Sequence, residues 1–204
     1  SVLPPREGFG LEKAGAVALT LRDNIYAAPK DINYLVYGGI EEKPFENIRF
    51  CSVSVPVIRF RSRGDSYAHS IAKLISKTDA KIDLIEVHNR PKIAFKLKVL
   101  LPQIPVVLYL HNDPQSMKEL LLPKDRERYA NILDYFICVS EFVKLRFLEG
   151  MNLQFNNISV VYNSLTTNRP LVSKKKHIVF VGRMVPEKGA MLVCESVSRL
   201  ASLL

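Results

Sequence analysis

Short apolar runs alternate with amphipathic stretches along most of the chain. The apolar runs are short enough to be strands buried on both faces of a parallel sheet. The predicted strands are residues 34–37, 48–55, 82–87, 105–110, 135–139 and 158–162, with residues 2–5 as the end of a first strand. The helical spacing predicts helices over residues 11–21, 66–77, 92–101, 125–133 and 141–147. The alternation therefore predicts an α/β fold: a Rossmann-like, mainly parallel sheet with helices on both faces.

Polar residues and glycines follow the predicted strands. They are Glu7, Gly8 and Gly10 (in the loop after the first strand, which also contains Phe9), Gly38, Gly39, His88, Asn89, Arg90, His111, Asn112, Asp113, Ser140, Glu141 and Asn163. In open parallel sheets, ligands bind beyond the carboxyl ends of the strands. The sequence therefore predicts one ligand-binding crevice at this edge.

His111 is the sharpest candidate, because it directly follows an apolar strand and could form hydrogen bonds in a cleft. A purely structural histidine at a strand end is the alternative. Asp113 stands before Pro114, which is also typical of a turn. Glu141 after Ser140 fits the cap of the following helix.

A second candidate site lies near the end of the sequence. Residues 178–181 form an apolar run that predicts a strand, Gly182 ends it, and Pro186 suits the start of a helix. Arg183 and Lys188 then fall on a strand-to-helix loop, where free amide groups suit a diphosphate. Solvated charges on a loop are the alternative.

Residues 166–176 are polar and basic, and we interpret them as a linker between domains. The predicted organisation is a first domain over residues 1–165, the linker, and an incomplete second Rossmann-like domain over residues 177–204. Isolated apolar segments at 178–181 and 191–204 predict an exposed apolar surface. These segments could fold back on the first domain, self-associate with a second copy of the chain, or be poorly ordered.

The net charge is +9, which fits anionic partners such as phosphorylated sugars or a negatively charged membrane surface. Arg59, Arg61 and Arg63 alternate at period two, so they would share one face. This face could contact phospholipid head groups or an anionic acceptor, with a solvated loop as the alternative. Basic and aromatic residues do not interleave as in a nucleic-acid-binding element, so no nucleic-acid partner is expected.

Three cysteines, Cys51, Cys138 and Cys194, lie far apart without any Cys-x-x-Cys motif. They are interpreted as reduced core thiols of a cytoplasmic protein, and no metal site is expected. No apolar run is long enough to span a membrane as a helix. Gly8 and Gly10 begin a dinucleotide-binding pattern, but Lys13 stands where the third glycine belongs.

Several of these motifs, in this order, resemble bacterial family 4 glycosyltransferases of the GT-B fold. They are the G-x-G loop, His-Asn-Arg-Pro at 88–91, His-Asn-Asp at 111–113, Val-Ser-Glu at 139–141, Val-Val-Tyr-Asn at 160–163 and Gly-Arg…Glu-Lys-Gly at 182–189. The chain then corresponds to the acceptor-side domain and the first strand and helix of the donor domain.

The resemblance implies retaining, metal-independent sugar transfer from a nucleotide-sugar donor, without a cofactor. It implies a catalytic role for His111 at the donor sugar, and charge neutralisation of the leaving diphosphate by Arg183 and Lys188. The acceptor and phosphate side of the cleft would be lined by Glu7, Gly8, Phe9, Gly10, Asn89, Arg90 and Asp113.

Together with the basic charge, the resemblance favours the assembly of a cell-envelope polysaccharide or lipopolysaccharide. The acceptor would be a saccharide or glycolipid, and the protein would lie in the cytoplasm or peripherally at the inner face of the membrane. Two departures stand out: the family's Asn-Gly-Val-Asp is Asn-Ser-Leu-Thr at 163–166, and its paired glutamates late in the second domain have no counterpart. We therefore expect the chain alone to be inactive.

Two other functional classes remain open at this stage. One is a non-catalytic module that binds an acceptor, a membrane or a partner. The other is an NAD-dependent Rossmann oxidoreductase, against which Lys13 argues.

Overall fold

The computed structural model describes residues 1–152, 154–163, 178–182 and 184–201. The chain divides into two compact units, Ser1–Thr166 and Thr167–Leu204, and each is described by itself. The predicted linker, residues 166–176, lies outside the described residues.

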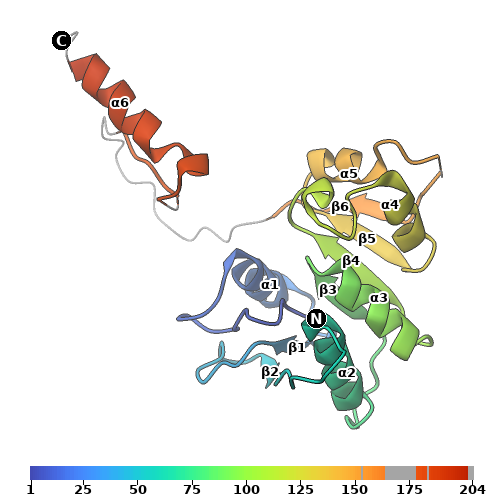
Figure 1. Cartoon of the computed structure of the whole chain (residues 1–204). Helices are drawn as coiled ribbons and strands as arrows, with labels where there is room; N and C mark the ends of the chain where they lie inside the picture. The colour runs from blue at the N-terminus through green and yellow to red at the C-terminus, as the bar shows by residue number, and fades with distance from the viewer. Residues whose placement is uncertain (153, 164–177, 183, 202–204) are drawn as a thin grey trace. The chain divides into compact units, whose positions relative to one another are not determined.

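The first unit is built on a parallel sheet (Figure 1). Its strands are β1 (Leu35–Gly38), β2 (Arg49–Ser52), β3 (Ile85–His88), β4 (Val106–Leu110), β5 (Tyr135–Cys138) and β6 (Ile158–Val160). They form two groups, β2-β1 and β3-β4-β5-β6, in which every pair is parallel. Val2 joins the groups through parallel bridges to Tyr37 and Val87. The predicted first strand therefore lies in the middle of the sheet.

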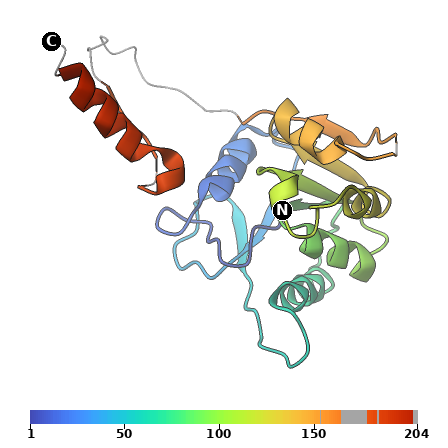
Figure 2. The same ribbon diagram turned by 45° about the horizontal axis from the view of Figure 1, so that its top comes forward.

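Helices cover both faces of this sheet. They are α1 (Ala16–Ala27), α2 (Arg63–Ile75), α3 (Pro91–Leu100), α4 (Pro123–Ala130) and α5 (Glu141–Leu148), with a short 3₁₀ helix η1 (Pro114–Ser116). The view turned by 45° shows α1 apart from the row formed by α2 and α3 (Figure 2). The predicted fold class is confirmed.

Two apolar clusters correspond to the two faces, because neighbouring strand residues point to opposite sides. Leu3 and Val36 pack with α1 in a small cluster. Val2 and Tyr37, one position along from each, belong to the large cluster that includes α2, α3 and α5. The sheet is therefore sandwiched between α1 and the remaining helices.

The predicted helix over residues 11–21 is wrong at both ends, since α1 continues to Ala27. Helix α1 begins only at Ala16, after turns at residues 11–13. Gly15 at the N-cap offers no side chain, and Glu7 Oε1 instead accepts a hydrogen bond from the Ala18 amide at 2.9 Å. A distant carboxylate thus sets the helix start, which local spacing does not reveal.

Two predicted strands also differ. The strand over 48–55 is reduced to β2, because the chain leaves the sheet in an extended loop before Pro56. The predicted strand over 178–181 is wrong, since these residues are irregular and pair with no strand of the described residues.

The second unit contains a 3₁₀ helix η2 (Pro186–Lys188) and helix α6 (Ala190–Ala201). Gly189 links them with a φ of 71°, a left-handed conformation that suits glycine. Val181 is 89% exposed, and Met191 and Leu192 of α6 are also exposed. The predicted exposed apolar surface is confirmed for these residues.

The three cysteines are free and occupy different environments. Cys138 is buried, as predicted, and burial raises its pKa to about 12. Cys51 is half-buried. Cys194 is exposed on α6, so its assignment to the core is wrong.

Arg126 of α4 is 1% exposed and stabilises the end of α5. Its guanidinium donates to the carbonyl oxygens of Phe147 at 2.7 Å and of Glu149, and also to the 120–121 backbone at 2.9 and 3.0 Å. Carbonyl groups at a helix end lack intrahelical hydrogen-bond donors, and the Arg126 guanidinium supplies the missing donors.

We therefore expect Arg126→Met to lower the free energy of unfolding by about 3 kcal/mol, because it leaves buried carbonyl groups without donors. The exposed Lys124 on the same helix supplies the control. Lys124→Met should change stability by less than about 0.5 kcal/mol in the same urea titration. Equal midpoints for the two variants would contradict this role of Arg126.

Candidate functional site

A group of ring side chains lies at the carboxyl ends of β3 and β4. The register pairs His88 with Tyr109, so these side chains emerge on the same face of the sheet. Tyr109 stacks on His111 with ring centroids 4.6 Å apart. His88 Nδ1 lies 2.9 Å from His111 Nε2, a hydrogen bond whose direction depends on the tautomers.

Glu86 lies two residues before His88 and therefore on the same face of β3. Its Oε2 is 3.2 Å from His88 Nε2, although the angles do not make this contact a hydrogen bond. Burial raises the pKa of Glu86, but the attraction of His88 and the contacts with Ser1 outweigh it and bring the pKa to about 2. An anionic carboxylate is therefore held beside a histidine that is only 1% exposed.

Asn89 fixes the position of His111. It is buried, adopts a left-handed φ of 53°, and its Oδ1 accepts a hydrogen bond from the His111 amide at 2.9 Å. A left-handed conformation is tolerated best by asparagine among residues with a side chain. The turn at 88–90 thus fixes the position of His111, which directly follows β4.

His111 stays neutral near pH 7. Burial lowers its pKa, the neighbouring His88 lowers it further, and Glu86 offsets only part of this, so the pKa is about 3. Within the described part of the chain, Nδ1 of His111 has no hydrogen-bond partner and is not enclosed. The ring can therefore present one polar nitrogen to a ligand as a hydrogen-bonding group rather than as a cation.

The other predicted residues occupy varied positions. Phe9 is fully buried and packs edge-on against Phe45 with centroids 5.0 Å apart, so the structure places it in the core rather than in a cleft. Glu7 caps α1. Asp113 accepts a hydrogen bond from the Gln115 amide and pairs with Arg146 at 3.2 Å, which ties its loop to α5.

Gly8 and Gly10 are both buried in a tight loop. A Cβ atom on Gly10 would lie 2.2 Å from the Lys43 carbonyl oxygen, and one on Gly8 would lie 2.5 Å from Glu41 Oε2. These glycines are therefore required by the close approach of residues 41–43, whatever else the loop contacts.

Arg90 precedes α3 and lines a cavity of about 640 Å³ at the carboxyl edge of the sheet. Asn89 lines the same cavity. The structure thus brings together His111, Asn89 and, through this cavity, Arg90. Lys188 lies in η2 of the second unit, and Arg183 lies outside the described residues.

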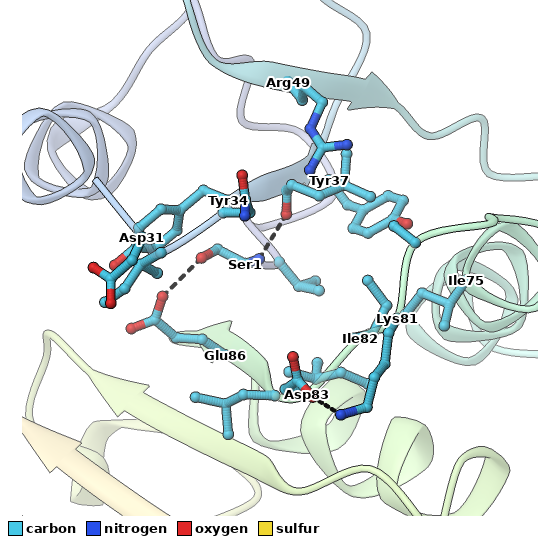
Figure 3. A pocket seen from close by; sticks show the side chains of 17 residues that line it. Ser1, Asp31, Tyr34, Tyr37, Arg49, Ile75, Lys81, Ile82, Asp83 and Glu86 are labelled. Carbon is cyan, nitrogen blue, oxygen red and sulfur yellow. Dashed lines mark hydrogen bonds and ion pairs between the residues drawn. The ribbon is translucent and has the colours of Figure 1, made fainter. Parts of the chain in front are cut away.

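A second cavity, of about 620 Å³, is lined by residues that precede the strands and by the first residues of β1, β2 and β3 (Figure 3). Ser1 lies at its centre, where its hydroxyl donates to Glu86 Oε2 at 2.8 Å. Ligands of parallel sheets bind at the opposite edge. We therefore assign the functional site to the edge that carries His111.

His88 was predicted at the carboxyl edge of the sheet, but no role was predicted for Glu86 or Tyr109. A signal was present, because Glu86 and His88 are polar residues at period two in an otherwise apolar strand. Such an alternation places both on one face. Among the described residues no group of three His, Cys, Asp or Glu side chains could hold a metal ion. The helices of the described residues include none long and apolar enough to cross a bilayer.

Comparison with known proteins gives consistent matches. The model of Glycosyltransferase Family 4 matches residues 27–169. The "Putative glycosyltransferase YtcC" of Bacillus subtilis (strain 168) is 28% identical over 155 residues, which are 67% of this chain and 37% of that protein. The chain thus spans well under half the length of this curated relative.

A solved structure shows the same fold. It is the crystal structure of Anabaena Alr3699/HepE in complex with UDP-glucose, with a TM-score of 0.50 and 15% identity. The likeness covers 80% of this chain and 44% of HepE.

The pKa of His111 leads to a stability prediction. An unfolded histidine has a pKa near 6.5, so the unfolded chain takes up a proton before the folded state does as the pH falls. Stability that is present above about pH 6.5 is therefore lost towards lower pH, by roughly 2 kcal/mol between about pH 7 and about pH 5.

His111→Gln should remove this part of the pH dependence, and Asn112→Ala, at the exposed neighbouring position, should retain it. Urea unfolding of the three proteins at both pH values measures the difference. An identical loss of stability in His111→Gln and in the unsubstituted protein would show that His111 is not held neutral.

Proposed function

Because the chain belongs to glycosyltransferase family 4, we propose that it forms the acceptor-side part of an enzyme that moves a sugar from a nucleotide-sugar donor to a saccharide or glycolipid acceptor. In this reaction the bond between the sugar C1 and the diphosphate breaks. A bond from the acceptor oxygen to C1 forms, and the acceptor hydroxyl gives up its proton to the leaving diphosphate. Retention of configuration at C1 is part of the proposal.

His111 carries the proposal within this chain. Its ring is neutral, is held by His88 and Asn89, and follows a buried strand at the ligand-binding edge of the sheet. A rigid polar group of this kind can bind a sugar hydroxyl next to the reacting carbon without attracting a counter-ion. Preorganised hydrogen-bonding groups are among the largest contributors to transition-state stabilisation.

Lys188 and Arg183 are proposed to neutralise the leaving diphosphate. Lys188 ends the short helix η2, directly before the left-handed Gly189 and helix α6. Amide groups at a helix start favour phosphate oxygens, and a lysine adds a full positive charge. HepE was crystallised with UDP-glucose, and we propose a donor of this nucleoside-diphosphate class for our protein as well.

The finer features remain proposals that rest on the family and on the charge of +9. They are transfer without a metal or cofactor, an acceptor from cell-envelope polysaccharide or lipopolysaccharide assembly, and peripheral contact with the inner face of the membrane. The comparisons do not favour the non-catalytic module or the NAD-dependent oxidoreductase.

The direct test uses the gene product that contains this sequence at its natural length. We expect it to release a nucleoside diphosphate from one of a panel of nucleotide sugars when an acceptor fraction is present. His111→Ala should reduce kcat by about 100-fold or more, the loss typical of a removed transition-state hydrogen bond. Lys188→Ala should cause a loss of similar size.

Lys30→Ala serves as the matched control, because Lys30 is exposed and precedes β1 at the opposite edge of the sheet. It should retain activity within about twofold. Full activity in His111→Ala would refute the proposed role, and a failure to release nucleotide from any sugar nucleotide would refute the function.

The 204-residue chain alone should show no sugar transfer, because it spans 37% of YtcC and 44% of HepE. Product formation from a radiolabelled sugar nucleotide measures this. Transfer above the rate of a heat-denatured sample would mean that the remaining length of the relatives is dispensable.

A further inference from the structure

The cavity of about 640 Å³ at the carboxyl edge is strongly basic. Its walls come from the segment after the central strand and from the first turns of α2 and α3. Four of its lining residues are cationic, namely Arg6, Arg63, Arg90 and Lys92, and the acid among them is Glu119. Cations from three separate elements thus surround one space.

Most of this charge is not neutralised internally. Lys92 is engaged, because its Nζ lies 2.9 Å from Ser62 Oγ and 3.3 Å from Asp65 Oδ2. No ion pair within the described residues involves Arg6, Arg63 or Arg90. Guanidinium groups match the geometry of phosphate oxygens, and the cavity is therefore suited to a phosphate group.

The loop of residues 53–62 leads directly into this cavity, since Ser62 and Arg63 line it. The loop exposes large apolar side chains, with Phe60 at 95% and Val57 at 102%. Arg59 and Arg61 flank Phe60, and the Arg59 guanidinium lies 5.0 Å from the centroid of its ring. Phe60 also has a φ of 65°, which a bulky residue rarely adopts.

Exposure of the Phe60 ring to water is energetically unfavourable. Apolar side chains are stabilised when they leave water for the acyl boundary of a bilayer, while neighbouring cations bind anionic head groups. A free phosphate would use the cavity but would leave Val57, Ile58 and Phe60 in solvent. The loop therefore favours a membrane lipid over a soluble phosphate ester as the ligand.

We propose that the cavity lined by Arg6, Arg63 and Arg90 binds the phosphate of an anionic membrane lipid, while Val57, Ile58 and Phe60 insert into the same bilayer. This binding requires neither a sugar nucleotide nor the transfer reaction. The placement of this lipid next to the site of sugar transfer rests on the proposed function. Asn89 lines the cavity and also accepts the hydrogen bond from the His111 amide, so a lipid head group held there would lie beside the proposed transfer site.

The sequence contains no tryptophan, so Phe60→Trp introduces a single fluorescent reporter into the loop. Vesicles of phosphatidylcholine with phosphatidylglycerol should shift its emission to shorter wavelength, and brominated acyl chains should quench it. Pure phosphatidylcholine vesicles should do neither at the same lipid concentration. An emission maximum that stays at the value for water with anionic vesicles would overturn the insertion.

Charge reversal tests the location of the surface. Arg61→Glu with Arg63→Glu should weaken binding to the anionic vesicles by about 20-fold or more, since each cation near such a surface contributes about fivefold. Lys30→Glu with Lys77→Glu makes the same change in net charge at exposed positions that precede β1 and β3. This control should weaken binding by less than about threefold. Equal losses would mean a non-specific charge effect and would overturn the proposal.

The double variant Arg6→Ala with Arg90→Ala distinguishes a lipid phosphate from a soluble phosphate ester, because it changes the cavity and leaves the loop of residues 53–62 intact. This variant should lose most of its affinity for vesicles that contain phosphatidic acid, and soluble glycerol phosphate should compete only weakly with them. Tight binding of glycerol phosphate without vesicle binding would assign the cavity to a soluble phosphate ester and overturn the lipid. Because sugar transfer is not measured, these outcomes are independent of the test with His111→Ala.

Discussion

The sheet depends on a short segment at the start of the chain that hydrogen-bonds on both sides. Val2 donates to the Glu86 carbonyl at 2.7 Å and accepts from the His88 amide at 3.0 Å. One residue along, Leu3 donates to the Tyr37 carbonyl at 2.8 Å. Without this central strand, β1 and β2 would have no connection to β3 through the sheet. The same strand delivers Arg6 to the basic cavity and Glu7 to the start of α1.

Because every strand runs parallel, the chemistry of the molecule collects at one edge. His88 ends β3, His111 follows β4, and the buried Asn89 links the two turns. Burial and a neighbouring histidine keep His111 neutral, while Glu86 stays anionic behind it. The edge therefore combines a neutral polar side chain with a basic cavity.

The sequence predicts the strands well where apolar runs are buried on both faces. The segment around β4 is an example, since all of Val106–Leu110 is buried as the uniform run implies. The prediction fails where a residue far away in the sequence determines where an element begins or how a loop turns. The start of α1 depends on Glu7, and the tight turn at Gly10 depends on the Lys43 carbonyl, and neither contact has a local signature. The strand expected at 178–181 lacks a partner among the described residues, which no pattern within the run could indicate.

For the site, the residues after the strands were predictable from sheet geometry, and the network behind them was not. His111 was expected from its place after an apolar strand. Its neutrality depends on burial and on His88, whose ring reaches it only because the register pairs His88 with Tyr109. Arg63 was expected on a basic face, but its convergence with Arg6 and Arg90 required the three-dimensional structure.

The most direct measurement of the central claim is amide hydrogen exchange of the natural-length protein with and without a nucleotide sugar such as UDP-glucose. If the nucleotide sugar binds at the carboxyl edge of the sheet, amide exchange should slow in the peptides that contain residues 111–117 and in those around Lys188. Protection confined to residues 31–35 and 80–86, which line the cavity at the opposite edge, would contradict the account.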